Sequence, residues 1–260
     1  MDEREGFERF RPVPQRRIIE KMDEYMSRRD YAGAERHLLY WLEEALAGKD
    51  LRGELMLRNE LIGHYRKTGE KDKALPQIDA ALALVEKMDF AGTVSAGTTY
   101  VNAATALNAF GENGRAMALF ERAREAYEKG GGVSPGLLGG LYNNMGLCCV
   151  SLGRYDDAQS YYDQAMAQMK KAEHGELEQA VTCLNRADAI AAQAGEEQGE
   201  ERIFCLLDEA LSLLDTPGIP RDGYYAFVCE KCAPAFDHYG YFLAAQDLKE
   251  RAEKIYGGGA

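Results

Sequence analysis

Apolar residues recur along this 260-residue chain at helical spacing, in pairs of segments joined by a short turn. The paired pattern returns about every 42 residues from end to end. One residue opens the turn inside each unit and serves as an anchor for comparing the units. The six anchors are Arg29, Gly69, Gly111, Gly153, Gly195 and Gly240. The pattern therefore predicts an all-α protein of about six helical hairpins.

The apolar spacing and the turn residues between segments place the helices. The two helices of each hairpin are predicted at 15–28 and 31–47, 51–67 and 71–88, 94–109 and 113–129, 136–151 and 155–171, 176–193 and 200–214, and 223–238 and 242–256. The last helix has an apolar side that can cover the end of a repeat array while its charged side faces water.

Small residues keep a fixed distance from the anchors. Five residues after the anchor stand Ala34, Ala74, Ala116, Ala158 and Ala245, and twelve residues after it stand Trp41, Ala81, Ala123, Ala165 and Ala252. Two antiparallel helices approach closely only where their side chains are small, so we expect these rows to be buried at helix crossings.

With these spacings the chain resembles the tetratricopeptide repeat family, and the long period is most similar to kinesin light chain units. The third and fourth units carry the resemblance most fully, through Tyr100, Ala103, Ala104, Gly111, Ala116, Phe120 and Ala123, and through Tyr142, Gly146, Gly153, Ala158, Tyr162 and Ala165. It implies a right-handed α–α superhelix. We expect a flexible tail at 1–14 and a single solenoid at 15–256, with repeats at 15–48, 51–89, 93–129, 135–172, 175–215 and 222–256.

Two units depart from the family pattern. The first has Arg29 where Gly is usual. The fifth has Asp188 at a small-residue position and about three extra residues within 195–202. If the extra residues lengthen the turn, Ile203, Leu207 and Ala210 return to the apolar rows, so we predict a lengthened turn in an otherwise intact repeat.

Composition and charge limit the classes of partner and the cellular compartment that are expected. The formal net charge of −12 and the lack of a basic cluster argue against nucleic acid as a partner. No apolar run approaches the roughly 20 residues of a membrane-spanning helix, and the charged N-terminus does not resemble a signal peptide. The six cysteines fall within predicted helices, as expected of core residues in a reducing compartment. A cytoplasmic protein with no membrane partner is the expectation.

Two cysteines have a spacing found in metal and thiol sites. Cys229 and Cys232 have the spacing of half a zinc site or a thiol pair, and His238 follows them. Both cysteines lie on apolar rows, so core packing is favoured over a metal or thiol site. The sequence has no HExxH motif and no phosphate-binding loop. We therefore expect no enzyme, no cofactor and no metal.

The family resemblance implies that the first helices of the hairpins line a concave groove that contacts the ligand. Residues nine and ten before the anchors would face it, and the candidates for peptide binding are Asn59, Asn102, Asn143, Asn144, Asn185, Arg186 and Lys231. An Asn amide can both donate to and accept from a peptide backbone, and the two cations can hold a carboxylate. The alternative is that these Asn side chains solvate the surface or bond a neighbouring helix.

The function expected from this resemblance is a non-enzymatic adaptor that binds a peptide or a partner protein in the groove. A second hypothesis is a signal-peptide sensor resembling bacterial quorum-sensing regulators, here without a DNA-binding domain. A third, of another class, is the metal or thiol protein at Cys229 and Cys232.

Overall fold

The computed structural model describes residues 11–257, and all regular secondary structure in that range is helical. Twelve helices follow in order: α1 (Gln15–Ser27), α2 (Tyr31–Ala47), α3 (Leu51–Thr68), α4 (Lys71–Lys87), α5 (Val94–Ala109), α6 (Asn113–Gly130), α7 (Pro135–Ser151), α8 (Tyr155–Met169), α9 (Glu176–Ala194), α10 (Glu196–Leu214), α11 (Gly223–His238) and α12 (Phe242–Tyr256). Consecutive helices pack pairwise, which confirms the predicted all-α fold of six hairpins.

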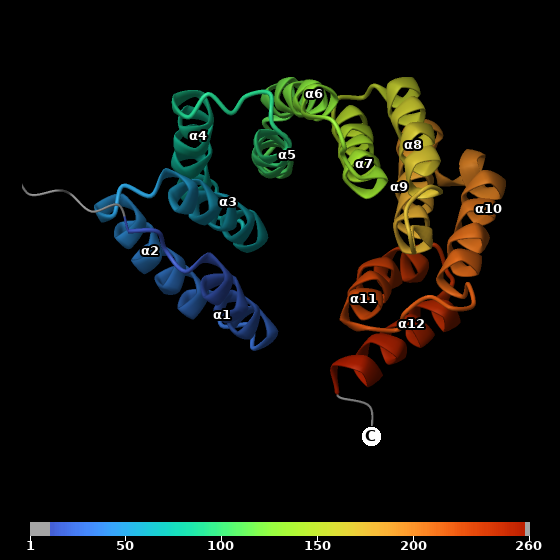
Figure 1. The fold of residues 1–260 in the computed structure, drawn as a ribbon. Coiled ribbons are helices and arrows are strands. Elements are labelled where there is room, and N and C mark those ends of the chain that lie inside the picture. The colour runs from blue at the N-terminus through green and yellow to red at the C-terminus, as the bar shows by residue number, and fades with distance from the viewer. Residues whose placement is uncertain (1–10, 258–260) are drawn as a thin grey trace, which may run out of the picture. The chain divides into compact units, whose positions relative to one another are not determined.

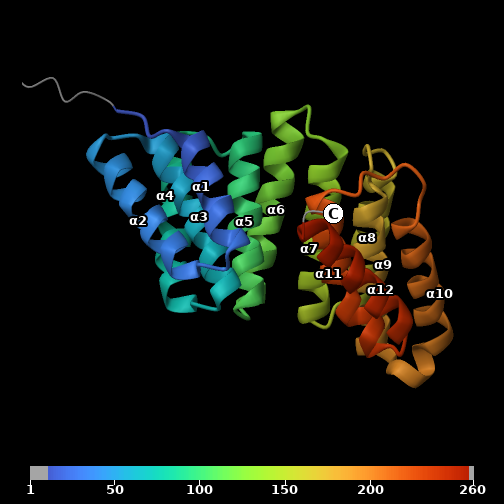
Figure 2. The same ribbon diagram turned by 90° about the horizontal axis from the view of Figure 1, so that it is seen from below.

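The helices belong to two compact units that meet in sequence at Gly131 and Gly132. In the first unit, α1, α3 and α5 form one layer and α2, α4 and α6 form the other (Figure 1). In the second unit the layers are α7, α9 and α11, and α8, α10 and α12 (Figures 1 and 2). We call α1, α3, α5, α7, α9 and α11 the first-helix layer of their respective units.

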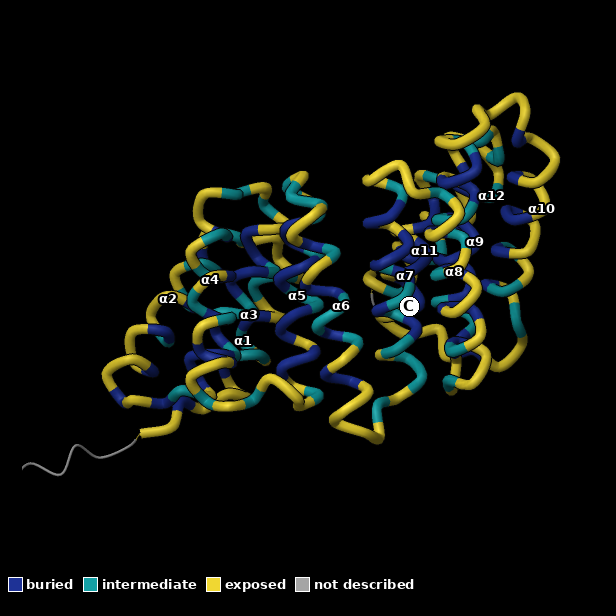
Figure 3. The backbone as a smooth tube through the Cα atoms, turned by 90° about the horizontal axis from the view of Figure 1, so that it is seen from above, coloured by how far each residue is buried: buried dark blue, intermediate teal, exposed yellow. Residues whose placement is uncertain are grey.

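The small-residue rows lie where the helices of a unit face one another. All five Ala residues of the first row are buried, as are the four Ala residues of the second row, whereas Trp41 is half-buried. Figure 3 shows the same distribution along the tube, with buried residues on the faces between helices and exposed residues at the turns. The predicted burial of these Ala residues is therefore confirmed.

The anchor residues share one backbone feature that favours glycine. All six have positive φ, including Arg29 at 56° and Gly69 at 75°. Glycine adopts this region without the steric cost that a Cβ imposes, which explains the recurring glycine. Arg29 adopts the same turn geometry despite its side chain, so its departure from the family pattern leaves the hairpin intact.

The fifth hairpin corrects the sequence prediction. The extra residues do not lengthen the turn, because α10 begins at Glu196, directly after a one-residue connection at Gly195. They extend the N-terminus of α10 instead, where Glu196 and Glu197 interact favourably with the helix dipole. Ile203, Leu207 and Ala210 are buried as predicted.

The buried rows of α9 also differ from the prediction by one position. Ala187 is fully buried whereas Asp188 is exposed, so each row in this helix lies one residue earlier than the anchor implies. Gly195 has φ 85° and ψ 154°, unlike the left-handed Gly69 with ψ 17°, so the turn that fixes the alignment has a different geometry.

Two further findings concern the ends of the chain. Residues 1–10 of the predicted tail, with Phe7 and Phe10, lie outside the described residues. Residues 11–14 are anchored, because Val13 is buried and its backbone N–H donates to Asp50 Oδ2 at 2.9 Å. At the C-terminal end, Leu248 and Ala252 of α12 are buried as expected of a capping helix. None of the described helices is long and apolar enough to cross a bilayer.

Candidate functional site

In the first unit, two of the predicted site residues join neighbouring helices of the first-helix layer. Asn102 on α5 donates from Nδ2 to Asn59 Oδ1 on α3 at 3.3 Å. Asn59 in turn donates to the Leu55 carbonyl at 2.9 Å and to Thr99 Oγ1 at 3.0 Å. The amide of Asn59 is thereby fixed from both helices.

The second unit repeats this arrangement. Asn185 on α9 donates from Nδ2 to Asn143 Oδ1 on α7 at 2.9 Å. Thr182 lies one turn before Asn185, as Thr99 lies one turn before Asn102, and it is fully buried. Asn143 is 6% exposed and so belongs to the interior of the layer. The geometry therefore matches the alternative interpretation of these Asn residues, that they bond a neighbouring helix.

The outer member of each pair keeps hydrogen-bonding capacity. An Asn amide has two N–H donors and a carbonyl acceptor. Asn102 and Asn185 each use one N–H in the bond to the neighbouring Asn, and both are only partly buried. Their second N–H and their carbonyl oxygen can still meet a ligand, held in place by the inner Asn.

The remaining predicted residues differ in their surroundings. Asn144 on α7 is half-buried and makes no hydrogen bond within the described part of the chain. Lys231 on α11 is exposed. Arg186 does not occupy the expected row, because of the one-residue shift in α9. Its Nη2 lies 3.4 Å from Asp163 Oδ1 on α8, and Asn185 takes the row position instead.

A cavity of about 570 Å³ adjoins the Asn pair of the first unit. Its volume falls in the range typical of ligand sites. Polar side chains and a few apolar ones line it: Gln15, Arg52, Leu55, Met56, Asn59, Glu60, Phe90, Thr93, Ser95, Thr98, Thr99 and Asn102. The cavity combines amide and hydroxyl groups with an apolar wall.

Two charged residues of this cavity lie in distinct environments. Burial, and then the nearby Asp23 carboxylate, raise the pKa of Glu60. The Arg52 guanidinium lies 5.6 Å from the Phe90 ring centroid, within the range of a cation–π contact. The cavity thus presents a cation beside an aromatic ring, and a carboxyl group that ionises less readily than usual.

The second unit carries a group of exposed aromatic residues that sequence reasoning missed. Tyr224 and Phe227 on α11 stack with ring centroids 6.2 Å apart and are 48% and 50% exposed. The Tyr224 hydroxyl donates to Glu178 on α9. Burial raises the pKa of Glu178, and the positive charge of Lys231 offsets part of that rise. The only sequence signal was two aromatic residues three positions apart, off the apolar row of α11.

The cysteines mostly match expectation. Cys229 and Cys232 are buried in the core of the second unit, and burial raises the pKa of the Cys232 thiol to about 12. Core packing of this pair is therefore confirmed. The prediction was wrong for Cys205, which lies exposed on α10 although all six cysteines were expected in the core.

Potential metal ligands lie close together in the first unit, on Glu35, His64 and Glu70.

The arrangement of helices is similar to that of several solved structures. The crystal structure of BtubC (BKLC) from P. vanneervenii matches with a TM-score of 0.55 at 17% identity, over 89% of this chain and 91% of that one. A putative kinesin light chain with TPR-like repeats from Podospora anserina matches with a TM-score of 0.52 at 18% identity, over 77% of this chain and 94% of that one.

A Rap protein solved in complex with competence and sporulation factor matches with a TM-score of 0.54 at 14% identity, over 91% of this chain and 73% of that one. No family model and no curated protein matches the chain. With its pairwise-packed helical hairpins and these structural neighbours, the chain has the tetratricopeptide-like helical repeat fold of kinesin light chain-like proteins.

Proposed function

We propose that this protein is a non-catalytic, cytoplasmic interaction scaffold that binds an extended peptide or a partner segment on the first-helix layer of its units. The observation that carries the proposal is the repeated Asn pair. Asn59 holds Asn102, and Asn143 holds Asn185, with hydrogen-bonding groups of the outer Asn still available. Preorganised amides lose little entropy when they pair with a peptide backbone.

Other groups in each unit support this proposal. The cavity beside Asn59 and Asn102 offers apolar surface and polar groups of a size suited to a few peptide residues. In the second unit, Lys231 and the exposed Tyr224 and Phe227 offer a cation and apolar contact area. Structural neighbours of this fold include a protein solved with a bound factor, which is in keeping with a binding role.

The test is to select peptides from a displayed random library on the purified protein and to map the bound peptide by hydrogen–deuterium exchange. When the peptide binds, we expect slower amide exchange in α3 and α5, or in α7, α9 and α11. Exchange in α4, α6, α8, α10 and α12 should change little. Protection confined to the second helices of the hairpins would contradict binding on the first-helix layer.

A second candidate is a signal-peptide sensor. It is favoured by the likeness to the Rap structure that contains competence and sporulation factor. A sensor must bind its ligand differently in two conformations, whereas a scaffold needs only one. Exchange protection that spreads to hairpins outside the peptide footprint would favour the sensor, and protection limited to the footprint would favour the scaffold.

A further inference from the structure

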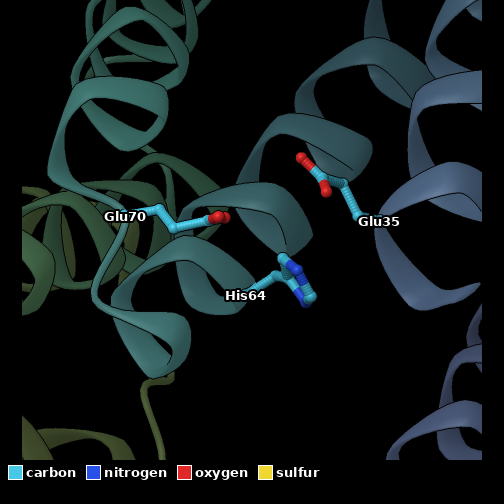
Figure 4. Close-up of side chains that lie close together, drawn as sticks. All are labelled: Glu35, His64 and Glu70. Atoms are coloured by element: carbon cyan, nitrogen blue, oxygen red, sulfur yellow. The ribbon is translucent and has the colours of Figure 1, made fainter. Parts of the chain in front are cut away.

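Three side chains from the first two hairpins extend toward one another in the first unit (Figure 4). Glu35 comes from α2, His64 from α3 and Glu70 from the turn before α4. One potential ligand atom of each residue lies within 4.8 Å of those of the other two. No sequence motif marks this group, because its members come from three separate elements.

His64 is buried without the hydrogen bonds that a buried imidazole normally has. It is 5% exposed, its Nδ1 is buried without a partner, and neither ring nitrogen bonds to any residue in the described range. Buried polar side-chain atoms usually have a hydrogen-bond partner. The imidazole of His64 has none among residues 11–257, so a bound ligand would supply the missing interaction.

We propose that Glu35, His64 and Glu70 bind one divalent transition-metal ion, for which Zn²⁺ is the best match. One imidazole and two carboxylates form a mixed N/O set of the kind that holds zinc with a fourth position open. Zinc bonds of about 2.0–2.2 Å place ligand atoms roughly 3.3 Å apart, so the three side chains need to close by an ångström or so. The open position is available to water or to a ligand atom of a partner.

The Lys73 ammonium pairs with both proposed carboxylate ligands. Its Nζ lies 2.8 Å from Glu35 Oε1 and 3.2 Å from Glu70 Oε1, so its single positive charge is shared by the two carboxylates. The Tyr65 hydroxyl also donates to Glu35 Oε1, at 3.0 Å. The Lys73 side chain is 49% exposed, so its flexible stem can swing into water when a metal ion takes over the carboxylates. Lysine and metal therefore compete for one site.

Binding at this site links two consecutive repeats. The ligands come from the second helix of one hairpin and from the first helix and turn of the next. A metal that binds the folded chain more tightly than the unfolded chain stabilises the fold by mass action. The metal would thus stiffen the first two hairpins.

The experiment is calorimetric titration of the full-length protein with Zn²⁺, together with thermal unfolding with and without the ion. We expect one site in the micromolar range and a higher melting temperature with Zn²⁺. His64→Gln and Glu35→Gln should each weaken binding by about tenfold or more, because they remove a direct ligand. Lys73→Gln should tighten binding, since it removes the competing ammonium.

The matched control is His238→Gln, which alters an exposed histidine that pairs with the single carboxylate of Glu196. It should leave the Zn²⁺ affinity unchanged. If His64→Gln does not fold, Glu35→Gln alone decides the test. The proposal is overturned if the wild type binds no Zn²⁺, if binding survives unchanged in the ligand variants, or if Lys73→Gln binds no more tightly than the wild type.

Discussion

Adjacent asparagines on α7 have different roles in the structure. Asn143 is buried and accepts the hydrogen bond of Asn185, whereas Asn144 has no bonded partner among the described residues. Asn143→Ala should lower the free energy of unfolding by about 1 kcal/mol or more, because it leaves the Asn185 N–H unpaired. Asn144→Ala should stay within about 0.5 kcal/mol of the wild type, since Ala is the better helix former.

Urea denaturation of the two variants side by side measures this difference. The neighbours share one helix and one substitution, so each is the control of the other. Equal losses in the two variants would contradict the assignment of Asn143 to the helix-linking pair.

The pKa of Glu60 gives a pH-dependent prediction. Because its folded-state pKa is raised, the folded protein favours the protonated carboxyl group. The associated stability is fully present below the unfolded pKa of 4.5 and is lost as the pH rises through the folded pKa. Glu60→Gln should therefore be more stable than the wild type at pH 7 and similar to it at pH 4.

Urea unfolding between pH 4 and pH 8 would show this pattern. Glu125→Gln, an exposed change on α6, serves as the control and should show no such dependence. A Glu60→Gln variant less stable than the wild type at pH 7 would mean that the charged carboxylate makes a stabilising contact.

Among single residues, the repeat pattern singled out the four Asn side chains that link neighbouring helices, but it did not predict which residues they bond to. Asn59, Asn102, Asn143 and Asn185 were all singled out by their distance from the anchors. The two pairings depend on the angle and spacing between neighbouring first helices, which hydropathy does not determine. The stacked Tyr224 and Phe227 were missed for a related reason, since a pattern search assigns aromatic residues to the core.

At the scale of the helices, the close contact in the fourth hairpin can be tested by a change of volume. Ala165 on α8 is fully buried, whereas Ala167 on the same helix is exposed. Ala165→Leu should cost about 1–3 kcal/mol, because the added atoms must enter a packed contact. Ala167→Leu is the control and should have little effect. Thermal unfolding that ranks the two variants equally would contradict the alignment of this hairpin.

The helix boundaries followed closely from turn residues and apolar spacing, except in the fifth hairpin. There the prediction assumed that extra residues enlarge the turn, whereas one glycine suffices to reverse the chain and the added residues extend α10. The choice between a longer turn and a longer helix depends on packing at the end of the hairpin. That packing is a tertiary effect, so the displaced row and the misplacement of Arg186 could not be read from the repeat pattern.

At the scale of the whole molecule, the described helices group into two compact units, and the single continuous solenoid expected from the sequence stays a prediction. Each unit has a buried apolar cluster within its own helices. Fragments 1–131 and 132–260 should therefore each be helical and unfold cooperatively when expressed separately. Circular dichroism during urea unfolding measures this. Fragments that are unfolded alone would instead support one solenoid whose core is shared along its length.

The most direct test of peptide binding on the first-helix layer is the affinity of a selected peptide for the wild type and for the variant that lacks the outer Asn of the unit that the peptide protects, Asn102→Ala or Asn185→Ala, measured by fluorescence anisotropy. Loss of the two hydrogen bonds that the second N–H and the carbonyl oxygen of the outer Asn can make should weaken binding by about tenfold or more, while the free energy of unfolding falls by only about 1 kcal/mol. An affinity equal to that of the wild type, in a folded variant, would contradict peptide recognition through these residues.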